Sequence, residues 1–298
     1  MASLSLPVVD HKRGLIITGI GGLMMTFDAP LLRLAEVDVY TATFWRGLCV
    51  FIAMTGFWAI MRFVKRDPMP LVNGFDGWVV ACMHCCANLL FMLALFNTTV
   101  ANVVFILALN PLFAALFSLV WLRERISTAT WLAIASGIVG VAIIVSDGVE
   151  TGSLFGDLMA LLCVMVIGLG LTFVRRSGKN LSLAPGVGAL MAALAVLPFA
   201  TTVAAPFDKL IFVAANGLIV MPIASAFLVA GPRYLTAAEV AMFFLLETVL
   251  APIWVWLLMD EVPSVQSLVG GAIILATLGG HAIYRLSQAH GERHPVTS

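Results

Sequence analysis

Long apolar stretches separated by short polar or charged connections make up most of the chain. Each stretch spans about 20 residues, the length that a helix needs to cross a hydrocarbon core of about 30 Å. Runs bounded by charge, proline or glycine predict helices at 14–32, 40–62, 75–96, 99–121, 128–146, 155–174, 182–203, 210–230, 236–258 and 266–285. The pattern therefore predicts an all-α membrane protein of ten transmembrane helices.

The basic residues of the connections predict the orientation of these helices. With a cytoplasmic N-terminus, 13 of the 16 Lys and Arg residues fall on the cytoplasmic side. Only Arg33 and Lys209 fall outside, and Arg46 lies within a helix. This asymmetry follows the positive-inside rule, and a missed or extra helix would disturb it. We therefore expect both termini to be cytoplasmic and the first helix to be retained.

Composition excludes several classes of protein. Hydrophobic residues make up 61% of the chain and charged residues 11%, with a mean hydropathy of +1.06, whereas soluble proteins carry roughly 25% charged residues. A net charge of zero provides no basic surface for nucleic acid. The five cysteines lie in apolar stretches, which favours buried thiols over disulfides. We expect no cofactor, and lipid and a small molecule as partners.

The two halves of the chain are similar in sequence. A shift of 137 positions aligns Trp121–Glu124 with Leu258–Glu261 and Ser127 with Ser264. It also places Asn102 and Asn110 on Glu239 and Glu247. The alternative is the general likeness of apolar helices. We interpret the match as two five-helix repeats, 1–150 and 151–298, which are inverted because five is odd. Many secondary transporters are built this way.

The pattern Asn110-Pro111, Leu122-Arg123-Glu124-Arg125 and glycines at 137 and 140 resembles EamA-type drug/metabolite transporters. In that family a glutamate at the end of this helix recurs in each repeat, as Glu124 and Glu261 do here. The segment Thr26–Pro30 and the chain length are most similar to the bacterial aromatic amino-acid exporters. The resemblance implies a bacterial inner-membrane location and a central cavity lined mainly by helices 1, 3, 4, 6, 8 and 9.

Polar residues inside the membrane are the first candidates for function, because an Asp or Arg at a helix centre costs about 2.5–3.5 kcal/mol. Glu247 lies mid-helix and is interpreted as a proton carrier or a partner for a substrate amine; a neutral acid hydrogen-bonded between helices is the alternative. Asp28 precedes Pro30 and suits an outer gate or an exposed helix end. Arg46 favours an ion pair with Asp28, Glu36 or Asp38 over carboxylate binding.

Helical spacing predicts two matching walls of the cavity. Phe243 lies four residues before Glu247 and shares its face, and Asn102, Ile106 and Asn110 form the equivalent stripe in the fourth helix. Glu239 lies on the same face as Glu247 but near the cytoplasmic end, where solvation or gating is favoured.

His84 and Asn88 share a face of the third helix, because they are four residues apart. His84 is a second candidate for proton exchange, and hydrogen bonding between helices explains it equally well. Cys82, Cys85 and Cys86 surround it, but one helix rarely supplies a complete tetrahedral metal site. We therefore predict no metal.

Aromatic side chains complete the candidate cavity. For any single ring, contact with lipid is the commoner role, but together they form an apolar cleft suited to amphipathic solutes. The candidates are Phe27, Trp45, Phe91, Phe243 and Trp254.

These patterns predict a transporter that works by alternating access and exports aromatic and other neutral amino acids. A multidrug or metabolite permease of the same fold and a channel-like facilitator are the alternatives. The chain contains neither a catalytic His-Glu-x-x-His pair nor a nucleophile elbow, so we do not expect an enzyme. Ten helices can enclose one pathway, so a monomer suffices.

Overall fold

The computed structural model describes residues 11–64, 70–123, 127–200, 204–230 and 237–291. These residues form helices with no strand among them. In chain order the elements are α1 (His11–Met25), α2 (Asp28–Leu34), α3 (Val39–Ala59), η1 (Ile60–Val64), α4 (Gly74–Asn97), α5 (Val100–Leu107), α6 (Asn110–Trp121), α7 (Thr128–Thr151), α8 (Leu154–Ser177), α9 (Ala184–Val196), η2 (Leu197–Phe199), α10 (Phe207–Ala215), η3 (Asn216–Val220), α11 (Met221–Ala230), α12 (Ala237–Met259) and α13 (Val265–Gly291).

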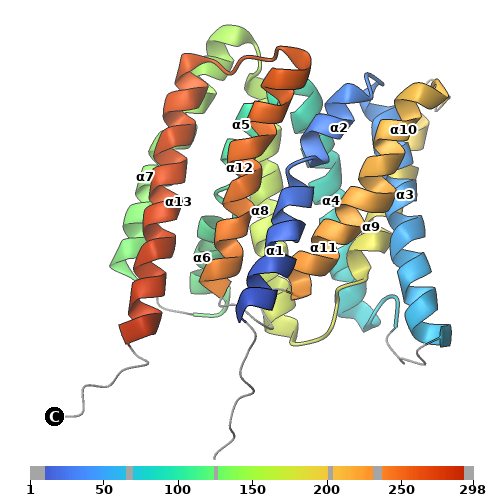
Figure 1. Cartoon of the computed structure of the whole chain (residues 1–298), viewed down its shortest axis with the longest axis horizontal. Helices are drawn as coiled ribbons and strands as arrows, with labels where there is room; N and C mark the ends of the chain where they lie inside the picture. The colour runs from blue at the N-terminus through green and yellow to red at the C-terminus, as the bar shows by residue number, and fades with distance from the viewer. Residues whose placement is uncertain (1–10, 65–69, 124–126, 201–203, 231–236, 292–298) are drawn as a thin grey trace, which may run out of the picture.

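The helices form a bundle in which α1 begins and α13 ends at the same end (Figure 1). Within the described residues, seven helical stretches are long and apolar enough to cross a membrane. Three shorter apolar helices, at Ala184–Phe199, Leu246–Met259 and Val265–His281, lie within or close to the remaining predicted spans. The all-helical membrane fold is therefore confirmed, while the count of ten crossings and the membrane orientation stay predictions.

Two helical stretches are broken in a way that proline explains. Pro30 has no N–H to bond the carbonyl of Thr26, and the helix is interrupted by a turn at Thr26 and Phe27. Pro111 likewise leaves the carbonyl of Leu107 without its helical partner, and α5 ends there.

A third proline does not break its helix, because α12 runs through Pro252 from Ala237 to Met259. A proline in a membrane helix is tolerated where neighbouring groups satisfy the freed carbonyl.

The contacts between helices match when each helix is replaced by its equivalent in the other half of the chain. The first half comprises α1 to α7 and the second α8 to α13. The pairing of α4 with α8 is matched by that of α11 with α1, and α6 with α8 is matched by α12 with α1. Equivalent helices also meet directly, as α3 with α9 and α7 with α13 (Figure 1). The helix contacts of one half therefore recur in the other.

Local geometry repeats at the same offset of 137 residues. Arg123 and Asp260 follow equivalent helices and both have positive φ, at 55° and 56°. Ser127 accepts a hydrogen bond from the Thr130 backbone N–H, and Ser264 does so from that of Ser267. These hydroxyls cap the N-termini of α7 and α13, so the two halves share turns and caps as well as helices.

Glycines allow the closest helix contacts. A Cβ on Gly140 of α7 would lie 2.9 Å from the Gly270 carbonyl oxygen of α13, and one on Gly270 would lie 2.6 Å from that of Gly140. Any larger residue would push these helices apart, as expected for packing through small residues in a membrane.

Candidate functional site

A buried charged cluster lies where the break between α1 and α2 meets α3, α4 and η3. It consists of Asp28, Arg46, Asn88 and Asn216, which we call the Arg46 cluster. The Arg46 guanidinium donates to Asp28 Oδ1 at 3.0 Å and Oδ2 at 3.2 Å, to Asn88 Oδ1 at 3.2 Å and to Asn216 Oδ1 at 3.1 Å. Arg46 and Asp28 are 5% and 3% exposed, so the ion pair is shielded from solvent.

Asn216 forms hydrogen bonds with both charged residues of this cluster. Its Nδ2 donates to Asp28 Oδ1 at 2.7 Å and to the Asp28 carbonyl oxygen at 3.0 Å. The residue opens η3, a π-helical turn that separates α10 from α11. Such turns occur frequently at functional sites. A Cβ on the next residue, Gly217, would lie 2.5 Å from Cys49 Cβ, so only glycine lets η3 approach α3 this closely.

Three of the predicted site residues, Asp28, Asn88 and Phe91, therefore meet at Arg46. The Phe91 ring lies beneath the guanidinium, 5.3 Å from ring centroid to Cζ, a cation–π geometry. Arg46 is paired with Asp28, one of the three partners expected for it.

Two of the predicted aromatic residues stack across the helices at the α1–α2 break. The rings of Phe27 and Trp254 have centroids 5.4 Å apart and planes inclined by 19°. The Trp254 indole N–H donates to Thr26 Oγ1 at 3.1 Å. Trp254 thus lies on α12 with its polar edge held at the turn and its face against Phe27.

Glu247 and His84, the predicted proton sites, lie within electrostatic range of Arg46, and Glu247 also interacts with Asp28. Both side chains are partly exposed. Phe243, one helical turn before Glu247, packs against α1, since a Cβ on Gly19 would lie 3.4 Å from its ring. The side chain of Glu239 lies outside the described residues.

The remaining predicted residues are dispersed. Trp45 is half-buried in the core beside Phe44, with ring centroids 5.4 Å apart. Ile106 is fully buried in the same core. Asn110 begins α6, and its Oδ1 is buried without a hydrogen-bond partner.

A second polar cluster lies at the end of the bundle that the charge pattern predicts to face outside. It comprises Thr98, Asn102, Asp147, Asp157, Ser264 and Ser267, which we call the Asp157 cluster. Asp157 Oδ1 accepts from Thr98 Oγ1 at 2.7 Å and from Asn102 Nδ2 at 3.0 Å. Ser267 donates to Asn102 Oδ1, and Ser264 donates to Asp147 Oδ2 at 2.6 Å.

Asn102, Ile106 and Asn110 consequently do not form the continuous wall that helical spacing predicted. The stripe assumed one helix, whereas the turn between α5 and α6 separates Asn110 from the other two. Asn102 is 1% exposed, and both the Nδ2 and the Oδ1 atom of its side-chain amide are hydrogen-bonded within the Asp157 cluster.

Sequence reasoning missed Asn216, Asp147 and Asp157. Asn216 could have been found as a lone amide within the apolar stretch 210–230. The two acids lie at or near the ends of predicted helices 128–146 and 155–174, where charge is normally solvated. In the structure they are 7% and 0% exposed.

Glu261 ties the two halves together at the same end. Its Oε1 accepts from the Val100 backbone N–H at 2.7 Å, and Oε2 lies 3.7 Å from Arg33 Nε. Arg33 also donates to the Thr98 carbonyl oxygen. The carboxylate therefore satisfies an N–H at the first turn of α5, which no helical carbonyl can reach.

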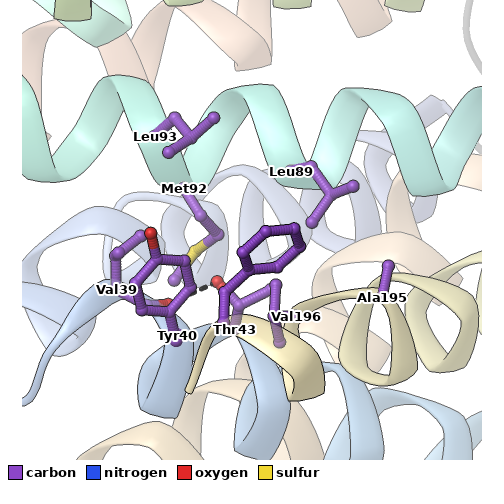
Figure 2. Close-up of a pocket in the computed structure, with 9 residues that line it drawn as sticks. Val39, Tyr40, Thr43, Leu89, Met92, Leu93, Ala195 and Val196 are labelled. Atoms are coloured by element: carbon purple, nitrogen blue, oxygen red, sulfur yellow. Dashed lines mark hydrogen bonds between the residues drawn. The ribbon is translucent and has the colours of Figure 1, made fainter. Parts of the chain in front are cut away.

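A pocket of about 330 Å³ lies between α3, α4 and α9, and none of its lining residues belongs to either cluster. Its lining is apolar apart from Tyr40 and Thr43, and the Thr43 hydroxyl bonds the Val39 carbonyl (Figure 2). Phe199 at its rim is 67% exposed. The pocket holds no charged group, so it suits an acyl chain better than a polar substrate.

The model of the EamA-like transporter family matches the chain twice, over residues 12–146 and 154–280. The chain belongs to the EamA-like transporter family. This EamA protein is therefore a multi-pass membrane transporter of two-repeat architecture, with a small molecule as its substrate. Enzymatic activity is not general in this family.

A solved structure described only as "Crystal structure of protein" superposes on the EamA chain with a TM-score of 0.65 at 17% identity. The match covers 92% of this chain and 96% of the other. At that identity the likeness concerns the fold alone. No curated protein matches the chain.

Proposed function

We propose that the protein is a secondary transporter that exports neutral amino acids, aromatic ones included, across the bacterial inner membrane. The observation that carries the proposal is the Arg46 cluster, placed beside the Phe27–Trp254 stack and the Glu247 carboxyl. An amino acid presents a carboxylate, an ammonium group and a side chain. The site offers one kind of partner for each.

The chemistry of the three partners is complementary to a zwitterion. A guanidinium binds a carboxylate through directed hydrogen bonds, and Arg46 binds that of the substrate in exchange for one of the three partners it holds in this structure. Glu247 supplies an acceptor for the ammonium group. The stacked Phe27 and Trp254 rings offer an apolar face for an aromatic or aliphatic side chain.

We further propose alternating access through an inverted repeat with ten crossings and both termini cytoplasmic. The exchange of contacts between the halves supports two bodies that can rock about the site. The charge asymmetry of the loops supports the orientation. The two repeats enclose the site within one chain, so a monomer is sufficient.

The test is substrate flux in proteoliposomes that contain the purified protein, with Phe, Tyr, Trp, Thr, Met and a cationic drug. Saturable movement of unmodified amino acids is expected. Drug movement alone would replace the proposal with multidrug efflux. Flux that does not saturate would indicate a channel-like facilitator.

Aromatic recognition has a matched control on one helix. Trp254→Leu should raise the KM for aromatic substrates more than that for Thr. Trp256, two residues along α12, is 52% exposed, and Trp256→Leu should change neither. Equal effects of the two substitutions on KM would show that Trp254 is not part of the substrate site.

Proton coupling at Glu247 is tested separately. Glu247→Gln keeps the size of the side chain but cannot exchange a proton, so transport driven by a pH gradient should be lost while substrate exchange persists. Unchanged proton dependence would move the coupling elsewhere, with His84 the next residue to replace.

A further inference from the structure

Among the described residues, Asp157 is the most deeply buried acid outside the Arg46 cluster, and none of them places a cation in contact with it, as Arg46 is with Asp28. The side chain is 0% exposed. Its Oδ1 accepts hydrogen bonds from Thr98 and Asn102. Oδ2 is buried without a hydrogen-bond partner.

The surroundings of Oδ2 bring a second acid close. A Cβ on Gly148 would lie 2.2 Å from Asp157 Oδ2, so this oxygen sits directly against the residue that follows Asp147. The two carboxyl groups interact electrostatically, and the Ser153 side chain forms a hydrogen bond with the same carboxyl. Like charges in a shielded site disfavour the doubly ionised state.

The backbone holds the carboxyl in this position. Asp157 lies in the first turn of α8, and a Cβ on Gly156 would lie 2.5 Å from the Asn97 carbonyl carbon. Only glycine lets α8 approach the end of α4 so closely. The Asp157 carboxyl is thus held against the end of α4, where Thr98 donates to it.

Other charges near the site do not neutralise it. Among the described residues, the charged groups that interact with the Asp157 cluster are Asp147 and Arg33, and Glu261 pairs with Arg33. Arg33 reaches the Thr98 carbonyl but is paired with Glu261. The start of α8 favours an anion, but this partial charge acts on a carboxyl whose second oxygen has no donor.

We propose that Asp157 is a proton-binding site of the transporter, occupied by a proton on Oδ2 when the predicted outer ends of α4, α5, α7, α8 and α13 are packed together. The proton leaves Oδ2 for the outer solution when these ends separate. Loss of the proton leaves two neighbouring carboxylates, whose repulsion opposes repacking. Proton binding at Asp157 is thereby linked to closure of the outer end.

The geometry of Oδ1 and Oδ2 fits the protonated acid. Oδ1 accepts two hydrogen bonds as a carbonyl oxygen does, and Oδ2 carries the proton as a hydroxyl. Asp157→Asn reproduces this arrangement, with the amide oxygen in place of Oδ1 and the NH₂ group in place of the Oδ2 hydroxyl. The variant should therefore fold.

Infrared spectroscopy of the detergent-solubilised full chain tests the proposal without any substrate. With ¹³C-labelled aspartate, wild type at neutral pH should show the C=O band of a protonated carboxylic acid, and Asp157→Asn should lose it. Asp260→Asn is the matched control, because Asp260 is exposed at the same end and its φ of 56° is tolerated by Asn. A band that persists in Asp157→Asn would overturn the proposal.

Two further measurements keep the test decisive. Thr98→Val removes a donor to Oδ1 and should shift the band rather than abolish it; no shift would contradict the assignment to Asp157. Thermal unfolding of wild type should become easier as the pH is raised, whereas Asp157→Asn should be much less sensitive. Stabilisation of wild type by Na⁺ but not by choline, lost in Asp157→Asn, would assign a sodium ion in place of the proton and refute the proposal.

Discussion

Asp28 and Asp157 are both aspartates buried between helices of the same bundle, yet the groups that surround their carboxyls differ. Asp28 has a guanidinium within hydrogen-bond distance of both oxygens and an amide on one of them. Asp157 has a hydroxyl and an amide on one oxygen, none on the other, and an acid as its electrostatic neighbour. Charge is retained by a partner at one site and removed by a proton at the other.

The difference has a functional meaning for a transporter. An ion pair such as Arg46–Asp28 places fixed hydrogen-bond donors and acceptors between the helices and can orient a polar substrate. A carboxyl without a counterion exchanges charge with the solution, which is what coupling to a proton gradient requires. Intramembrane ionisable groups mark such pathways.

The largest expected effect separates these two aspartates directly. Asp28→Asn leaves the Arg46 guanidinium buried without a carboxylate and should cost about 3–5 kcal/mol, the usual effect of removing one partner of a buried pair. Asp157→Asn should cost much less. Thermal unfolding in one detergent at neutral pH measures both.

If Asp157→Asn lowered the thermal stability as much as Asp28→Asn, Asp157 would be ionised, and the two sites would not differ in the way proposed. Asp28→Asn combined with Arg46→Met should be less destabilised than Asp28→Asn alone, because no unpaired charge remains.

A smaller effect concerns the directed hydrogen bonds of Arg46. Arg46→Lys keeps the charge, but an ammonium group on a shorter chain cannot reach Asp28, Asn88 and Asn216 with the same fork of donors. Loss of a donor to one buried amide oxygen should cost about 1–3 kcal/mol. If Arg46→Lys kept full stability but transported less, the guanidinium donors would contribute to substrate binding and not to stability.

Much of this architecture was accessible from the sequence. Apolar length and loop charge predicted the helical stretches, because the bilayer permits few backbone solutions. The offset of 137 residues predicted a match whose turns and caps the structure shows at Arg123, Asp260, Ser127 and Ser264. These features depend on local sequence, which explains the agreement.

The sites were predicted less completely, because they depend on which helices meet. The sequence identifies Asp28, Asn88 and Phe91 singly and favours an ion pair for Arg46 over carboxylate binding, but it does not show that the four meet or that Asn216 joins them. Asp157 lies at the end of an apolar run, and sequence does not show that Gly156 allows the end of α4 to cover it. Periodicity also fails across the turn between α5 and α6.

The paired caps of the repeat give a more moderate test, and one that reaches the Asp157 cluster. Ser127→Ala removes only the cap of α7 and its local bonds, and should cost about 0.5–2 kcal/mol. Ser264→Ala removes the equivalent cap of α13 together with the donor to Asp147, and should cost more. Thermal unfolding of both single variants decides the comparison, and equal losses would show that the Ser264–Asp147 bond contributes little.

The smallest effect comes from a third aspartate, which is exposed and therefore needs neither a cationic partner nor a bound proton. Asp38 caps α3 and accepts from the Tyr40 and Thr41 backbone N–H groups at 3.0 Å each. Partial burial acts to raise the pKa of this carboxyl, but the hydrogen bonds outweigh it and hold the pKa below its ordinary value. Because the folded pKa is lowered, the stability that it contributes is complete above about pH 4 and is lost as the pH falls through the folded value. The loss should stay under about 1 kcal/mol, since solvent screens an exposed carboxylate. Asp38→Asn keeps a capping oxygen without the charge, so acid titration of thermal stability should differ from wild type only in that range. A difference at neutral or alkaline pH would contradict the assignment, because the Asp38 carboxyl is ionised there in both the folded and the unfolded state.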